Sequence, residues 1–147
     1  MGRITDYEKD FYGWALHNAE LLRQGRLSEI DIEHIAEELE SMGKRDRREL
    51  TSRFKILLAH LLKWQYQPKY RGRSWQRSVD EQRSEIIDLI TDNPHLKGYI
   101  SQSLIDAYPK AVKLAVKETR LSTNSFPSKC PYSLEKILDE DFYPESE

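Results

Sequence analysis

The chain has 147 residues, enough for one ordinary domain, which argues against an enzyme with a separate cofactor domain. Its longest apolar run, Ile56 to Ala59, is far shorter than the roughly 20 residues of a membrane-spanning helix, so no transmembrane segment is expected. Residues 1–8 carry both signs of charge and no apolar core, so we predict no signal peptide and a cytoplasmic location. The single cysteine, Cys130, excludes an internal disulfide and every multi-cysteine metal site.

The charge is unevenly distributed along the chain. Residues 1–43 carry four basic and ten acidic side chains, a net charge of −6. Residues 44–77 carry eleven basic and two acidic side chains, a net charge of +9, and residues 78–147 have a net charge of −5. Either the acidic ends fold back on the basic middle, or the middle forms an anion-binding surface.

A first helix is predicted from a capping-box pattern at Thr5 and Glu8. Aromatic and aliphatic residues then recur at spacings of three and four, which indicates one apolar helical face. Gly25 predicts the end of this helix.

A second capping pattern, at Ser28 and Asp31, opens a much longer apolar stripe that keeps its helical phase through Gly43. The members of this stripe are Ile32, Ile35, Ala36, Leu39, Met42, Leu50, Phe54, Leu57, Leu58 and Leu61. We therefore predict one long helix over about 29–66. The alternative is a hairpin that turns near Gly43, because a glycine inside a helix costs roughly 1 kcal/mol.

Pro68 breaks the helical pattern, and Ser74 is expected to cap a third helix that ends near residue 92. Pro94 is expected at the first position of the next helix. Pro109 lies inside that helix and should kink it or split it in two.

Residues 122–147 form an irregular tail with one short helical turn over 134–138, and Phe142 and Tyr143 are expected to hold it on the core. No segment shows the alternation of a strand. The prediction is a single all-α domain over 1–147, in which three or four shorter helices pack on the long central helix.

Several sequence segments occur together and in order along nearly the whole chain. They are Asp10 to Ala15, Ile35 to Gly43, Leu58 to Pro68, Ser74-Trp75 with Gln82-Arg83, and Phe126-Pro127 with Cys130 to Tyr132. These segments resemble a bacterial family known as domain of unknown function twenty-nine, frequent in cyanobacteria and proteobacteria. The resemblance implies a small all-α protein and no particular reaction. Pro109 departs from the family pattern, so a local kink is expected there.

Histidine and glutamate pairs on helical faces raise the question of a metal site, with His34, Glu38 and His60 as the candidate ligands. In a continuous helix His34 and His60 would lie roughly 39 Å apart and could not share a metal. Only the hairpin alternative would bring them together. We therefore expect no metal and no cofactor, and keep a metal-binding helical-bundle enzyme as an alternative.

His60 lies between apolar neighbours on its predicted helix, so its imidazole needs polar partners. The candidate members of such a polar cluster are Glu38, His60, Trp64, Trp75 and Arg83. The cluster is either structural or the lining of a pocket, and we favour the structural role. No catalytic residue is assigned, because no base is placed beside Cys130 and no nucleophile elbow or phosphate-binding loop occurs.

Cations alternate with aromatic residues over 63–77, a composition typical of surfaces that bind single-stranded nucleic acid. The candidates are Lys63, Tyr66, Lys69, Tyr70, Arg71, Arg73 and Arg77. The same stretch could instead dock on the acidic 33–40 face of its own or another subunit. We predict a non-enzymatic interaction module that binds a protein partner or itself, with RNA or single-stranded nucleic acid as the alternative ligand and no membrane partner.

Overall fold

A computed structural model describes residues 6–146. Its helical elements, in chain order, are α1 (Phe11–Arg23), α2 (Ile32–Tyr66), η1 (Pro68–Tyr70), α3 (Arg73–Asp92), η2 (Pro94–Tyr99), α4 (Ile100–Thr119), η3 (Thr123–Ser125) and α5 (Leu134–Leu138). No strand occurs in the described range, which confirms the all-α class. No helix in this range is both long enough and apolar enough to cross a membrane.

The contacts of the chain divide it into two compact units, one ending at Lys44 and the other beginning at Arg45. We call these the N-terminal unit and the C-terminal unit. The first turns of α2 belong to the N-terminal unit, and the rest of this helix belongs to the C-terminal unit.

The long helix is continuous, so the alternative of a hairpin near Gly43 is wrong. A Cβ atom at Gly43 would meet nothing within 4 Å, which shows that no close approach requires a glycine there. The helix begins at Ile32, three residues later than the predicted start, and ends at Tyr66 as expected.

The first helix begins at Phe11, later than the capping-box pattern predicts. Asp10 is its N-cap and accepts a hydrogen bond from the backbone N–H of Gly13 at 3.0 Å. The predicted cap, Thr5, lies outside the described residues. The end of the helix is as predicted, because Gly25 adopts a left-handed conformation with φ of 71° directly after the C-cap.

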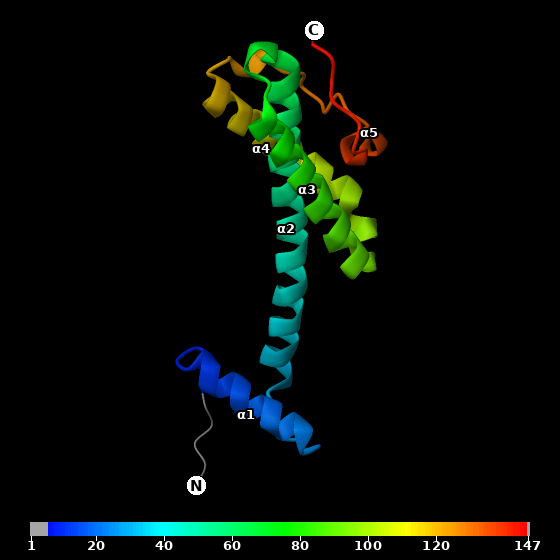
Figure 1. Ribbon diagram of the computed structural model, residues 1–147. Coiled ribbons are helices and arrows are strands. Elements are labelled where there is room, and N and C mark those ends of the chain that lie inside the picture. The colour runs from blue at the N-terminus through cyan, green and yellow to red at the C-terminus, as the bar shows by residue number, and fades with distance from the viewer. Residues whose placement is uncertain (1–5, 147) are drawn as a thin grey trace. The chain divides into compact units, whose positions relative to one another are not determined.

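The core of the C-terminal unit forms around the second half of α2, with α3, α4 and α5 gathered about it (Figure 1). The fully buried side chains of α2 begin at Leu50 and recur with helical spacing. The principal core residues are Leu50, Phe54, Leu57, Leu58, Leu61, Val79, Ile86, Ala107, Ala111, Ala115 and Ile137. The hydrophobic effect therefore holds this unit together through side chains from four helices.

Two local expectations for the C-terminal unit need correction, and one of two alternatives is excluded. The N-cap of α3 is Gly72 rather than Ser74, because the extended backbone of Gly72 already leads into the helix. Pro94 is at the start of a helix as predicted, but Pro94–Tyr99 is a 3-10 helix of six residues that precedes α4. Pro109 lies within α4 and does not split it, so only the second of the two alternatives, a kink or a split, is excluded.

The tail beyond α4 packs on the core. The predicted short helix over 134–138 is confirmed as α5. Phe126, Tyr132 and Ile137 are buried, and Phe142 and Tyr143 pack against the core cluster.

Candidate functional site

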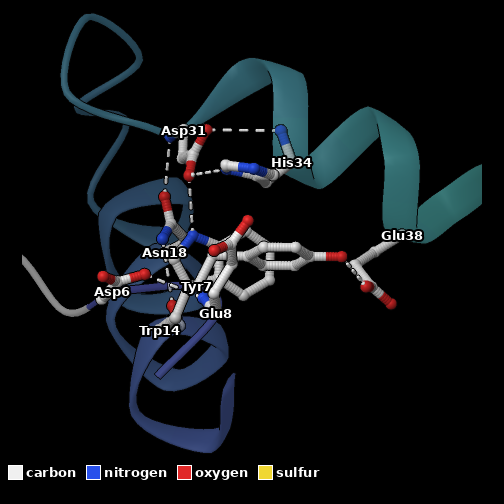
Figure 2. Close-up of polar contacts among 8 residues, drawn as sticks. All are labelled: Asp6, Tyr7, Glu8, Trp14, Asn18, Asp31, His34 and Glu38. Atoms are coloured by element: carbon white, nitrogen blue, oxygen red, sulfur yellow. Dashed lines mark hydrogen bonds and ion pairs between the residues drawn. The ribbon is translucent and has the colours of Figure 1, made fainter. Parts of the chain in front are cut away.

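Asp31, the residue directly before α2, collects hydrogen bonds from two parts of the N-terminal unit (Figure 2). Its carboxylate accepts a hydrogen bond from Nε1 of Trp14 at 2.9 Å and one from Nδ1 of His34 at 2.7 Å. Its backbone N–H donates to Oδ1 of Asn18 at 2.8 Å. Asn18 is buried and also donates to the carbonyl of Trp14. These bonds fasten α1 to the beginning of α2.

Tyr7 covers the same face of α2 (Figure 2). Its ring stacks on the imidazole of His34, with ring centroids 4.0 Å apart and 15° between the planes. Its hydroxyl donates a hydrogen bond to the carboxylate of Glu38, and its ring meets Trp14 edge-on. The first turns of α2 therefore pack against Tyr7 through the polar side of the helix, which carries His34 and Glu38.

The carboxylates of this cluster shift the pKa values of their neighbours. Hydrogen bonds from His34 and Trp14 lower the pKa of Asp31. The hydrogen bond to Asp31 raises the pKa of His34 in spite of partial desolvation. The hydrogen bond to Glu38 raises the pKa of Tyr7 to about 12.

The cluster contains groups that can move protons, namely an Asp–His pair whose imidazole stacks on a tyrosine ring. Within residues 6–146 no group of three or more histidine, cysteine or carboxylate side chains is placed to hold a metal ion. The two grooves described below are lined by residues of the C-terminal unit. The hydrogen bonds of Asp31 to Trp14, Asn18 and His34 make the cluster a structural joint between α1 and α2.

The candidate metal ligands have other partners in the structure. His34 and Glu38 contact Tyr7 in the N-terminal unit. His60 donates through Nδ1 to the carbonyl of Ile56 on its own helix at 3.0 Å, and burial lowers its pKa. The turn that would have brought these residues together does not occur, because α2 is continuous.

The other candidates for a polar cluster lie in the C-terminal unit, where Tyr143 connects two of them. The ring of Tyr143 lies 4.7 Å from that of Trp64, and the guanidinium of Arg83 lies 5.5 Å from the Tyr143 centroid. Trp75 instead lies under the ammonium of Lys63, at 4.9 Å. The ring contact of Trp64 and the cation–aromatic contact of Trp75 place both tryptophans in the packing of the unit.

Arg83 is 1% exposed and binds the C-terminal segment. Its strongest hydrogen bonds go to the carbonyls of Ile137 at 2.8 Å and Phe142 at 2.7 Å, and it makes longer ones to Lys136 and Glu140. Desolvation lowers its pKa. A groove of about 390 Å³ beside it is rimmed mainly by acidic side chains. The predicted polar residue is therefore a clamp between α3 and the tail.

Three of the basic and aromatic candidates over 63–77 are occupied by contacts within the fold. Lys63 is buried and forms an ion pair with Glu118 at 3.1 Å. Tyr66 packs edge-on against Phe126. Arg71 lies over the ring of Trp64 and donates to its carbonyl at 2.7 Å.

The remaining candidates are exposed. They are Lys69, Tyr70, Arg73 and Arg77. Arg73 and Arg77 line an open groove of about 730 Å³, which they share with Gln76 and two carboxylates, Asp80 and Glu81.

The first turns of α2 expose the apolar residues that the sequence pattern joins to the core stripe. Ile32 is 65% exposed, Leu39 is 63% exposed and Met42 is 53% exposed, and Ala36 on the same side is exposed as well. We call these four residues the α2 stripe. From Leu50 onward, the stripe of the same helix is buried.

Sequence reasoning missed both the Asp31 cluster and the exposure of the α2 stripe. The spacing of Asp31 and His34, three residues apart at a helix start, was a usable signal for their hydrogen bond. The partners Tyr7 and Trp14 carried no such signal, because they are 31 residues from Glu38 and 17 residues from Asp31.

The fold and its joints define an all-α protein with a long central helix and a clamped C-terminal tail. The chain matches the family described as Domain of unknown function DUF29 over residues 7–143, nearly its whole length, and it belongs to that family. Comparison with curated proteins and with solved structures finds no significant match.

Proposed function

We propose that this protein is an interaction module and that the α2 stripe is the surface with which it binds another polypeptide. The observation that carries the proposal is the exposure of Ile32, Leu39 and Met42 side by side on one helix. Single exposed apolar side chains are ordinary, but a contiguous row of them on a helix marks a site of interaction. Methionine adds an adaptable side chain that suits a binding surface.

The packing of the N-terminal unit supports this proposal. Tyr7 and Trp14 contact the His34 and Asp31 side of α2, and this contact leaves the apolar side open. In a helix whose only role is to pack within its own fold, the apolar side is expected to face the core. Since a single cysteine fits a reducing compartment, the proposal places the interaction in the cytoplasm.

The proposal is tested by placing a photo-crosslinking amino acid at position 39 in the cell that produces the protein. The matched control is position 105, because Ile105 on α4 is 65% exposed and lies in the C-terminal unit. We expect a discrete adduct from position 39 that disappears when Ile32→Lys is added. No adduct, or the same adduct from both positions, would contradict the proposal.

A second candidate function is binding of single-stranded nucleic acid, favoured by the exposure of Lys69, Tyr70, Arg73 and Arg77. It has less support, because Trp64 and Trp75 lie under Arg71 and Lys63, and two carboxylates share the groove. The test is oligonucleotide binding in low salt, which should weaken steeply with added salt and with the variant R73E/R77E. Binding that R73E/R77E leaves unchanged would end this candidate.

A further inference from the structure

The surroundings of the α2 stripe are strongly acidic. Residues 6–44 carry four basic and ten acidic side chains, a net charge of −6. Three of the acidic residues, Glu33, Glu37 and Glu40, are exposed on the same turns of α2 as the stripe. The ion pairs described for residues 6–146 do not involve these three carboxylates.

The helical period places the carboxylates along one edge of the stripe. With about 100° between successive residues, Ile32 and Leu39 share one direction, and Ala36 lies beside them. Glu33, Glu37 and Glu40 follow next around the helix, on the side away from Met42. The surface is thus an apolar strip about three turns long, bordered by a row of negative charge.

This combination selects the chemistry of the occupant. An apolar strip of this length on a helix suits the apolar face of a second helix, which offers side chains at matching spacings of three and four. A row of carboxylates beside the strip attracts cations and repels anions, which decides between partners of similar apolar content. Two copies of the N-terminal unit that meet stripe to stripe would bring together two net charges of −5, so the charge disfavours this symmetric pairing. Residues 44–77 of a second copy are cationic, but the apolar side of α2 is buried from Leu50 onward and is not free to cover the stripe.

We propose that the α2 stripe binds a cationic amphipathic helix of another protein. The apolar face of that helix covers Ile32, Leu39 and Met42, and its lysine or arginine side chains lie opposite Glu33, Glu37 and Glu40. This inference rests on the proposed function and adds the class of partner to it.

The test uses the full chain and two synthetic helical peptides of about five turns, a length that leaves three central turns free of frayed ends. Both peptides carry leucine at the same positions of one face; one carries lysine and the other glutamate along its flanks. Affinities are measured from the fluorescence anisotropy of labelled peptide. The protein variants are E33K/E37K/E40K, Leu39→Lys and the matched control Ile105→Lys, each checked for unchanged helicity by circular dichroism.

We expect the lysine peptide to bind the native protein at least about tenfold more tightly than the glutamate peptide, since three exposed charge pairs together are worth about this factor. E33K/E37K/E40K should reverse the preference. Leu39→Lys should weaken binding of the lysine peptide at least about tenfold by removing apolar contact, whereas Ile105→Lys should leave it unchanged.

Other results would overturn the inference in distinguishable ways. If the glutamate peptide binds as well as the lysine peptide and Leu39→Lys abolishes both, the stripe binds proteins but the cationic class is wrong. If sedimentation shows a dimer that Leu39→Lys dissociates, a second copy is the occupant, and again only the class is wrong. If neither peptide binds and the native protein is monomeric, the inference fails and the proposed function loses its support.

Discussion

Asp31 joins the two helices of the N-terminal unit through one carboxylate. It accepts hydrogen bonds from Trp14 on α1 and from His34 on α2, so the same negative charge stabilises both contacts. The pKa of Asp31 is lowered and that of His34 is raised, as expected for a pair that is charged on both sides. The stability of this joint should therefore depend on pH.

The stability of the N-terminal unit should be greatest between about pH 4 and pH 6.5. The contribution of the Asp31 carboxylate is present above its ordinary pKa of 3.8 and is lost as the pH falls through its lowered folded-state pKa. The contribution of the His34 imidazolium is present below its ordinary pKa of 6.5 and is lost as the pH rises through its raised pKa. Glu8 and Glu37 also raise the pKa of His34.

The measurement is the hydrogen-exchange protection factor of α1 amides as a function of pH. The variant His34→Gln should remove the decline on the alkaline side, whereas the control His95→Gln, at an exposed position in η2, should keep it. A native profile that is flat above pH 5 would show that the Asp31–His34 pair does not hold the joint.

In the C-terminal unit, Arg83 on α3 holds the tail in place through hydrogen bonds to its backbone carbonyls. Replacing it with methionine should lower the free energy of unfolding by about 2–3 kcal/mol, because carbonyls of the tail lose their buried donor. The tail beyond α5 should also become sensitive to proteolysis. The control is Arg77→Met, an exposed position on the same helix, which should change stability by less than about 0.5 kcal/mol. Equal effects of the two substitutions in chemical denaturation would contradict the clamp.

The residues of the Asp31 joint and of the Arg83 clamp were only partly predictable from the sequence. The sequence predicts Arg83 as a member of a polar cluster around His60, and Arg83 is buried. Its partners are backbone carbonyls more than 50 residues away, and no side-chain pattern marks a carbonyl. Tyr7 and Trp14 belong to the apolar face predicted for the first helix, and the sequence does not show which face of α2 they meet.

At the scale of elements, α2 decides the architecture. Its phase along 35 residues predicted one helix, and the structure has one helix. The same phase could not show that burial begins only at Leu50, because burial depends on whether another element is present to cover the stripe. Periodicity predicts which side of a helix is apolar, whereas tertiary contacts determine whether that side is covered.

Gly43→Ala should stabilise the protein by about 1 kcal/mol, because the position is interior to a helix and a Cβ there meets nothing within 4 Å. The contrasting control is Gly25→Ala, which should cost about 1 kcal/mol, since Gly25 has φ of 71°. Both changes are measured by denaturation followed by circular dichroism. A loss of stability in Gly43→Ala would indicate that the chain bends at this residue after all.

At the scale of the whole molecule, charge and apolar surface are both segregated. Residues 1–43 combine a net charge of −6 with the exposed α2 stripe, and residues 44–77 carry a net charge of +9. The charge blocks were readable from the sequence. The sequence did not show that the acidic block contains an exposed apolar row. The occurrence of both in one place indicates a binding surface.

The most direct measurement is the NMR signal of the Met42 methyl group. The chain has two methionines, so labelling with methyl-¹³C methionine gives a simple spectrum in which one signal reports on the α2 stripe. On titration with the lysine-flanked peptide, the Met42 signal should shift and saturate, and E33K/E37K/E40K should raise the peptide concentration needed for the same shift at least about tenfold. A Met42 signal that stays in place while the peptide binds would show that binding occurs elsewhere and would contradict the central claim.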